Sequence, residues 1–305
     1  MQAIYDVPAP AKLNLFLHVV GKRADGYHLL QSIFALIDWA DTLHFERRGD
    51  GQLARHDSGD ALPPEDLCLR AARALQTASG CTQGADIHIE KRLPAGAGMG
   101  GGSSDAASTL LALNRLWGLN WPLSKLLPLG LSLGADVPFF LGGNHAFVEG
   151  IGEILHPISL PEQHFAVLKP AASIATKEIF SSPLLARSNS VAIVAGFPAH
   201  NSGGDELKDL TAYLDGFGRN DLQKPAEAVC PEVVQALARL ESQFGNSRMT
   251  GSGSAVFSRL PLKEPADVDG NDGIAGAFLK DLPSGWLGKI CRSLDVHPLR
   301  GWAAD

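Results

Sequence analysis

A glycine- and serine-rich stretch of the chain has the composition of a phosphate-binding loop. It reads Pro94-Ala95-Gly96-Ala97-Gly98-Met99-Gly100-Gly101-Gly102-Ser103-Ser104 and continues into Asp105. Glycines permit positive φ angles and let the backbone approach a ligand closely. Because an apolar helical period follows, the unpaired first amides of that helix and its positive dipole end favour an anion. The stretch therefore predicts that an oligophosphate is bound by main-chain amides and serine hydroxyls.

Three other kinds of phosphate loop do not fit this stretch. Gly96, Gly98 and Gly101 satisfy the dinucleotide pattern, but that pattern requires an acidic residue about 20 positions later. No Asp or Glu occurs between Asp105 and Asp136. The lysine of a Walker loop and the further motifs of a protein kinase are also absent from the sequence. A flexible surface turn, with the serines acting as helix caps, remains the structural alternative.

Two further segments carry side chains that could act on a phosphate. Lys12 and Asn14 belong to a predicted strand over 10–20. Because side chains alternate along a strand, its two faces carry different sets of residues. One face carries Leu13, Leu15, Leu17 and Val19, and the other carries Lys12, Asn14, Phe16 and His18. Asp136 lies in the turn-like run Gly134-Ala135-Asp136-Val137-Pro138. By pattern alone, Lys12 and Asn14 fit a solvated strand face, and Asp136 fits a turn residue.

Regular elements flank the glycine loop on both sides. Residues 85–90 alternate small or polar with apolar side chains, which is typical of a half-buried strand. After the loop, apolar residues recur at helical spacing from Ala106 to Trp117, and Gly118 is a suitable end for that helix. The order of strand, loop and helix is one in which a helix start can face a bound phosphate.

The rest of the chain alternates between strand-like and helix-like segments, which favours an α+β fold. We expect strands over 10–20, 29–46, 163–169, 255–258 and 286–292, and helices over 66–79 and about 206–216, 230–242 and 272–281. Residues 47–64 are polar and predict a hairpin or an exposed excursion. A helix that begins near Pro122 should break or kink at Pro128, because proline has no amide hydrogen to donate.

The composition excludes several classes of protein. Of the 305 residues, 45% are hydrophobic and 19% charged, and the net charge is −7 without a basic run, so we expect no nucleic-acid partner. The N-terminal apolar stretch is short and interrupted by Lys12, Asn14 and His18. It predicts neither a signal peptide nor a membrane span, and therefore a cytoplasmic protein. The four cysteines are scattered and are expected to be reduced thiols.

Three separated segments resemble the motifs of the GHMP kinases. They are Lys12-Leu13-Asn14, the stretch Pro94–Ser104, and Met249-Thr250-Gly251-Ser252-Gly253. Four blocks are most similar to the branch of the family that acts on a cytidyl diphosphate sugar alcohol: Ala11–Leu15, Asp25–His28, Gly134–Phe139 and Gly218–Leu222. Since these blocks are spread from about residue 10 to about residue 260, the resemblance covers most of the chain.

The resemblance implies a two-domain GHMP kinase fold. Its N-terminal domain, expected over residues 1–158, would be like ribosomal protein S5 domain 2 and would bind ATP. Its C-terminal domain, expected over residues 159–305, would be ferredoxin-like. Substrate would enter the cleft between the two domains, and the protein would be a monomer or a weak homodimer.

The resemblance also implies a reaction. The family branch uses ATP to phosphorylate the 2-hydroxyl of 4-diphosphocytidyl-2-C-methyl-D-erythritol in the non-mevalonate route to isoprenoid precursors. Asp136 would take the proton from that hydroxyl, and Lys12 would steady the charge that develops on the phosphoryl group. The ATP phosphates would lie along Pro94–Ser104, where we expect no side chain to be tolerated at Gly100 or Gly101. Mg²⁺ would arrive with ATP rather than at a dedicated metal site, with Ser104 as a candidate contact.

Five residues would bind the rest of the substrate if the resemblance holds. Tyr27 and Phe180 would stack on the two faces of the cytosine ring, and His28 would form a hydrogen bond with that base. Asn14 and Thr176 would contact the substrate as well. Without the resemblance, these aromatic side chains would be assigned to packing.

Two alternatives to this function differ in their expected chemistry. Another GHMP kinase, of the homoserine or mevalonate type, would share the glycine loop but lack the Asp25–His28 block. A non-catalytic nucleotide sensor on the same fold would bind ATP without needing Asp136 or Lys12, and both residues are present.

Overall fold

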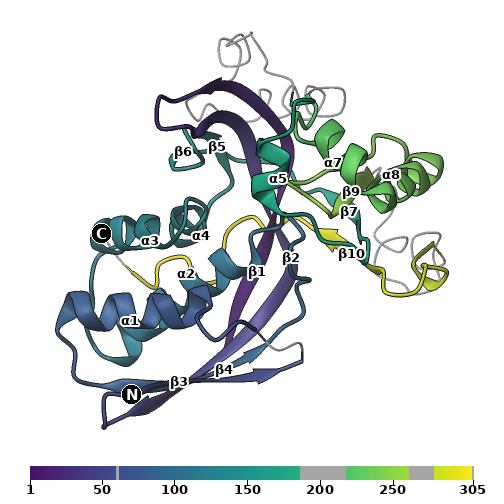
Figure 1. The fold of residues 1–305 in the computed structure, drawn as a ribbon. Coiled ribbons are helices and arrows are strands. Elements are labelled where there is room, and N and C mark those ends of the chain that lie inside the picture. The colour runs from purple at the N-terminus through teal and green to yellow at the C-terminus, as the bar shows by residue number, and fades with distance from the viewer. Residues whose placement is uncertain (60–61, 186–217, 261–277, 304–305) are drawn as a thin grey trace.

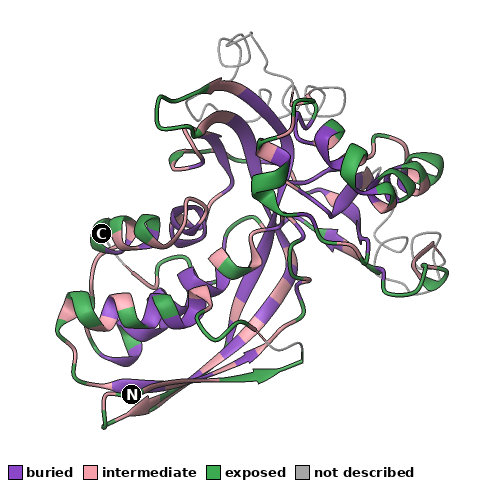
Figure 2. Cartoon of the chain, viewed as in Figure 1, coloured by how far each residue is buried: buried purple, intermediate pink, exposed green. Residues whose placement is uncertain are grey.

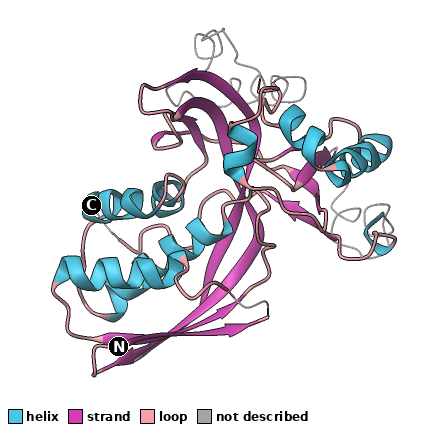
Figure 3. Ribbon diagram, in the orientation of Figure 1, coloured by secondary structure: helices cyan, strands magenta, loops and turns pink. Residues whose placement is uncertain are grey.

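The chain forms two β-sheets, each covered by helices (Figures 1 and 3). The computed structural model describes residues 1–59, 62–185, 218–260 and 278–303. The expected helix over 206–216 and most of the one over 272–281 lie outside these residues. No helix in the described part of the chain is both long and apolar enough to cross a membrane.

The larger sheet is built on a long antiparallel pair of strands. It consists of β1 (Ala3–Lys22) and β2 (His28–Arg48), which pair along almost their whole length. β4 (Gly84–Glu90) pairs with the C-terminal part of β2, and β5 (Ala146–Glu149) pairs with the N-terminal part. The expected strands over 10–20, 29–46 and 85–90 are thereby confirmed, and the first two are longer than predicted.

Two outer strands of the larger sheet are short. β6 (Ile154–Pro157) pairs antiparallel with β5, and β3 (Leu53–Ser58) pairs parallel with β4. The expectation of a hairpin or an excursion over 47–64 is therefore wrong for β3. A parallel neighbour needs a crossover connection, and helix α1 (Leu67–Ser79) supplies it between β3 and β4.

Four helices cover one face of this sheet (Figure 1). They are α1, α2 (Gly101–Leu116), α3 (Leu123–Leu133) and α4 (Val137–Gly142). Figure 2 shows that α2 is buried along most of its length, because it lies between the sheet and the other helices. The glycine loop is thus joined to a helix that the core holds rigidly.

Helix α3 continues through Pro128, so the expected break there is wrong. Pro128 removes one helical hydrogen bond, which ordinarily costs about 3 kcal/mol. Packing against α4 holds the helix together: a Cβ at Gly130 would stand 2.7 Å from Leu141 Cδ1 and 3.0 Å from Val137 Cγ1. This close contact between α3 and α4 depends on the tertiary fold, so the local sequence pattern does not predict it.

The smaller sheet is antiparallel and has the order β10-β7-β9-β8. Its strands are β7 (His164–Lys169), β8 (Arg248–Met249), β9 (Val256–Leu260) and β10 (Leu287–Arg292). Three described helices belong to this half of the molecule: α5 (Thr176–Phe180), α7 (Gln223–Val229) and α8 (Pro231–Phe244). The expected strands over 163–169, 255–258 and 286–292 and the expected helix over 230–242 are confirmed.

The two faces of β2 belong to different cores. Phe34 and Leu36 pack under the helices, whereas Ile33, Ala35 and Ile37 pack toward the smaller sheet. This alternation is what a strand period predicts. It makes the β1–β2 pair the layer that both halves of the molecule share.

The expected alternation along β1 fails at Phe16. The register with β2 shifts between Asn14 and Leu17, which marks a bulge or irregularity. Phe16 therefore packs in the same cluster as Leu13 and Leu15, although the simple period places it on the face of Lys12. The irregularity lies next to the two polar residues of interest.

Candidate active site

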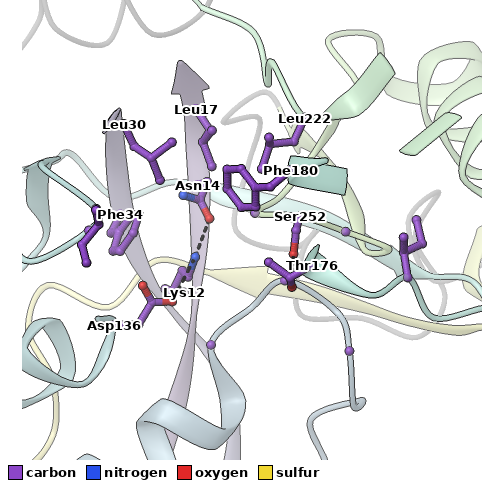
Figure 4. A pocket seen from close by; sticks show the side chains of 18 residues that line it. Lys12, Asn14, Leu17, Leu30, Phe34, Asp136, Thr176, Phe180, Leu222 and Ser252 are labelled. Atoms are coloured by element: carbon purple, nitrogen blue, oxygen red, sulfur yellow. Dashed lines mark hydrogen bonds and ion pairs between the residues drawn. The ribbon is translucent and has the colours of Figure 1, made fainter. Parts of the chain in front are cut away.

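A cavity of about 310 Å³ opens between the two halves of the molecule. Strand β1, the glycine loop, the start of α4, helix α5 and the turn before β9 all contribute to its lining. Among the lining residues are Lys12, Asn14, Asp136, Thr176 and Phe180 (Figure 4). The fold thus brings together five of the residues singled out in the sequence, from positions as distant as 12 and 180.

Lys12 and Asp136 form an ion pair at the floor of this cavity. Lys12 Nζ lies 3.6 Å from Asp136 Oδ2. The Lys12 side chain is 4% exposed and that of Asp136 is 30% exposed, so the carboxylate faces the cavity. Asp136 is the N-cap residue of α4, yet its side chain makes no capping hydrogen bond. The carboxylate is therefore directed at the ammonium rather than at the helix it precedes.

Burial governs the electrostatics of Lys12. Desolvation lowers the pKa of the Lys12 ammonium, and the charge of Asp136 opposes that change. The Phe34 ring adds a favourable contact, with Nζ 4.3 Å from its centroid. The expected solvated strand face is therefore wrong, because Lys12 and Asn14 are 4% and 1% exposed.

The glycine loop is joined to both halves of the molecule. Lys12 N donates to the carbonyl of Met99 at 3.0 Å, which fastens the loop to β1. Ser254 N and Ala255 N donate to the carbonyls of Gly96 and Ala97, both at 3.1 Å. These bonds hold the loop against the turn that leads into β9.

The loop separates two cavities. A second cavity of about 450 Å³ lies along Pro94–Ser103 and α1, and Gly96, Gly98 and Gly100 line both spaces. Gly100 is the N-cap of α2, and the amides of Gly101, Gly102 and Ser103 have no intrahelical acceptor at such a position. A polyphosphate lying across the loop would reach from the second cavity to the Lys12–Asp136 pair.

The structure argues against Ser104 as a metal contact. Ser104 is fully buried, and its hydroxyl donates to the carbonyl of Pro10 at 2.7 Å. Its amide donates to the carbonyl of Gly100 at 2.9 Å. The hydroxyl thus serves the packing of α2 on β1, and the amide forms the first hydrogen bond of α2. Ser103, by contrast, is partly exposed and lines the second cavity. Ser103 is the serine placed to face a ligand.

Three buried ionisable side chains form a cluster just before the glycine loop. Lys91 Nζ contacts the carboxylates of Asp41 and Asp105, the latter at 2.8 Å. Asp41 also accepts from the amides of Arg92 and Leu93, at 2.6 and 2.8 Å. Burial raises the pKa of Asp105 to about 8, although Lys91 opposes that rise. The cluster fixes the backbone just before Pro94.

The structure restricts Gly98 more than Gly101. Gly98 has φ +74°, and a Cβ there would stand 2.4 Å from the carbonyl oxygen of Thr250. A Cβ at Gly101 would meet Leu93 at 3.4 Å, and its φ is outside the positive range. We expect that no side chain is tolerated at Gly100 or Gly101. The geometry supports this expectation more strongly at Gly100, where φ is +73° and a Cβ would stand 3.0 Å from Phe140.

Gly98→Ala should weaken ATP binding by roughly 10-fold or more, since the strained φ and the clash with Thr250 both deform the loop. Equilibrium binding of ATP measures this effect. Gly118→Ala is the matched control, because Gly118 has φ +68° with open space around it and lies after the end of α2. Equal ATP affinity in the two variants would contradict the role of the loop.

The three residues expected to hold a pyrimidine differ in their place relative to the first cavity. Phe180 lines the cavity, and its ring stacks with that of His28 at a centroid distance of 5.2 Å and an angle of 25°. Tyr27 is 60% exposed, lies between β1 and β2, and is absent from the lining. Thr176 contacts Ser252 through a 2.8 Å hydroxyl hydrogen bond. The structure thus gathers His28, Phe180 and Thr176 and leaves Tyr27 in solvent.

Three polar residues of the site have roles that sequence reasoning missed. Thr250 Oγ1 accepts from Asn14 N at 2.9 Å, and Ser32 accepts from the Asn14 side chain. Asn220 Nδ2 donates to the carbonyls of Met249 and Gly251, both at 2.8 Å, and so shapes the turn before β9. Thr250 and Asn220 lie in blocks noticed by resemblance, but nothing in the sequence distinguishes Ser32 from any other strand serine.

The chain matches two family models, "GHMP kinases N terminal domain" over residues 66–144 and "GHMP kinases C terminal" over residues 205–269. It is 60% identical over 303 residues to the 4-diphosphocytidyl-2-C-methyl-D-erythritol kinase of Methylibium petroleiphilum, covering 99% of each chain. A crystal structure of 4-(cytidine 5'-diphospho)-2C-methyl-D-erythritol kinase matches with a TM-score of 0.72 at 32% identity, covering 93% of this chain and 98% of that one. The homoserine kinase from Cytophaga hutchinsonii matches at 16% identity with a TM-score of 0.63, over 95% and 96%, and shares the fold alone. The expected two-domain GHMP kinase fold class is confirmed.

Proposed function

Because this chain belongs to the family of 4-diphosphocytidyl-2-C-methyl-D-erythritol kinases within the GHMP kinases, we propose that it phosphorylates the 2-hydroxyl of 4-diphosphocytidyl-2-C-methyl-D-erythritol. The phosphoryl group comes from ATP, and the products are the 2-phosphate and ADP. The reaction belongs to the methylerythritol phosphate route to isoprenoid precursors. The enzyme is an ATP-dependent kinase of a small molecule.

The observation that carries this proposal is the position of the Lys12–Asp136 pair beside a loop that faces two cavities. The second cavity takes ATP, and its phosphates cross the loop toward the first. The acceptor hydroxyl then lies next to Asp136, whose partly exposed carboxylate accepts the proton as the new P–O bond forms. The Lys12 ammonium and the α2 amides stabilise the charge on the transferred group.

Asn14, Thr176, Phe180, His28 and Tyr27 are proposed to bind the rest of the substrate. The His28–Phe180 stack supports a site for a flat ring, because a base can replace or extend such a stack with a gain of about 1–3 kcal/mol. Tyr27, which stands exposed between β1 and β2, would close over the base from the hairpin. The alcohol end of the same substrate then reaches Asp136.

Mg²⁺ is proposed to enter together with ATP. Within the described residues, no group of three His, Cys, Asp or Glu side chains could hold a metal ion. The residues present fit a metal that is held mainly by phosphate oxygens and water, with Ser103 as the protein contact. Bound there, the ion would neutralise charge on the β- and γ-phosphates.

Several expectations on the biology of the protein stay predictions. We infer a cytoplasmic enzyme that acts as a monomer or a weak homodimer and has neither a nucleic-acid nor a membrane partner. The net charge of −7 supports the absence of a nucleic-acid partner, since protein surfaces that bind nucleic acids are usually basic. The division into domains at residues 158 and 159 is also a prediction.

A panel of acceptors tests the proposed function. The purified chain is incubated with ATP, Mg²⁺ and either the cytidyl substrate, homoserine or mevalonate, and ADP release is coupled to NADH oxidation. We expect turnover with the cytidyl substrate and a new phosphomonoester signal in ³¹P NMR. Turnover of homoserine or mevalonate, with none of the cytidyl substrate, would overturn the assignment.

A further inference from the structure

The side-chain amide of Asn14 lies in a buried chain of hydrogen bonds between Lys12 and strand β2. Lys12 Nζ donates to Asn14 Oδ1 at 2.5 Å, and Asn14 Nδ2 donates to Ser32 Oγ at 2.9 Å. Ser32 Oγ donates in turn to the carbonyl of Phe16 at 2.5 Å. Since Lys12, Asn14 and Ser32 are 4%, 1% and 1% exposed, water competes little for these bonds.

The donors and acceptors of this chain allow one orientation of the amide. An ammonium only donates, so the Asn14 atom that faces Lys12 must be the oxygen. A serine hydroxyl has a single proton, and Ser32 gives it to the carbonyl of Phe16. Ser32 must therefore accept from Asn14 Nδ2, and both ends of the chain require the same orientation. The Thr250 hydroxyl, 3.4 Å from Asn14 Oδ1, lies on the oxygen side as well.

The amide oxygen of Asn14 is uncharged, so it binds the Lys12 ammonium without neutralising its positive charge. The other polar partner of Lys12 Nζ in the described structure is Asp136, at 3.6 Å. A carboxylate in place of Asn14 would compete with Asp136 and with the transferred phosphoryl group for the same positive charge. The amide oxygen fixes the position of Nζ and leaves that charge available to the reaction.

We propose that Ser32 is a positioning residue for phosphoryl transfer, and that it sets the place of the Lys12 ammonium by orienting the Asn14 amide. This inference rests on the proposed function and adds to it a residue that does not line the cavity. Without the Ser32 hydroxyl, Asn14 Nδ2 loses its acceptor and the amide is held at its oxygen end alone. The NH₂ end can then shift, and Asn14 Oδ1 and the Lys12 ammonium that it holds move away from the position suited to the reacting group.

Ser32→Ala tests the proposal, with Ser108→Ala as the matched control. Ser108 is also buried, and its hydroxyl donates to another β1 carbonyl, that of Pro8, at 2.8 Å. Both variants therefore lose a buried serine bond to the same strand, but only Ser32 touches Asn14. We expect Ser32→Ala to lower kcat about 10-fold with little change in the KM for ATP, because one oriented hydrogen bond is lost. Ser108→Ala should lose thermal stability and keep its kcat.

A pH profile separates positioning from general destabilisation. The titratable group that faces Lys12 is Asp136 from α4, while β1 contributes the amide of Asn14 and β2 the ring of Phe34. Loss of the oriented oxygen disfavours the protonated amine, so the alkaline limb of kcat should move to lower pH in Ser32→Ala. It should stay in place in Ser108→Ala.

The outcomes distinguish the inference from the function on which it rests. If the unmodified enzyme does not turn over the cytidyl substrate, the proposed function fails. If it does, and Ser32→Ala has the kcat and pH profile of Ser108→Ala, the positioning role of Ser32 is refuted.

Discussion

Asp136→Asn is expected to lower kcat by about 10²- to 10⁴-fold, because the acceptor hydroxyl loses the proposed base that takes its proton. Asn has nearly the same shape as Asp, and the Asp136 side chain makes no capping bond that the change would break. The affinity for ATP, measured by equilibrium binding, should therefore stay close to that of the unmodified enzyme. Single-turnover kinetics with the cytidyl substrate measures the loss of the chemical step.

Asp86→Asn is the control for this prediction. Asp86 is also partly buried, at 22%, and it pairs with Arg48 at 3.0 Å on strand β4, which lines neither cavity. This change should leave kcat unaltered. Near-normal turnover by Asp136→Asn would remove Asp136 from the mechanism and leave the reaction to positioning alone.

Lys12→Met should reduce kcat by about 10²- to 10³-fold, the scale observed when one donor to a developing oxyanion is removed. Methionine fills a similar volume without the charge. Because burial lowers the pKa of Lys12, the unmodified enzyme should also lose activity on the alkaline side below the ordinary range of a lysine. The protonated form of Lys12 is the active one, so activity falls as the pH rises through the lowered pKa.

Lys169→Met is the matched control for the Lys12 variant. Lys169 is likewise 4% exposed, and its ammonium donates to the carbonyls of Pro170 and Ala172 at 2.6 and 2.9 Å. This change should lower the melting temperature and leave kcat largely unaltered. The variant with both Lys12→Met and Asp136→Asn should be little slower than the worse of the two single variants, since the pair acts as a unit. Fully multiplicative losses would mean that the two residues act independently.

The site depends on contacts between the two halves of the molecule. Thr250 binds the backbone of Asn14, and the turn before β9 pairs with the glycine loop through Gly96 and Ala97. The glycine loop and the strand that carries Lys12 are therefore held by the same turn. A change in this turn is expected to affect ATP binding and catalysis together.

The sequence by itself determined the parts of this protein that depend on local patterns. The glycine run predicts a phosphate loop, the helical period predicts α2, and apolar alternation predicts β1 and β4. These features arise within about ten to twenty neighbouring residues, so no distant contact is needed to infer them. The spaced motifs then indicated the family and implied roles in the reaction for Lys12 and Asp136, which the structure places 3.6 Å apart.

Only the tertiary structure decided which polar side chains are buried and what they face. Ser104 turns to Pro10, 94 positions away, and Asn14 binds Thr250, 236 positions away. Likewise, the continuous course of α3 through Pro128 depends on its contact with α4, and the place of Phe16 depends on an irregularity in β1. These features are set by competition for hydrogen bonds and space among residues that the fold brings together. Those residues are distant in the sequence, so a local pattern cannot predict them.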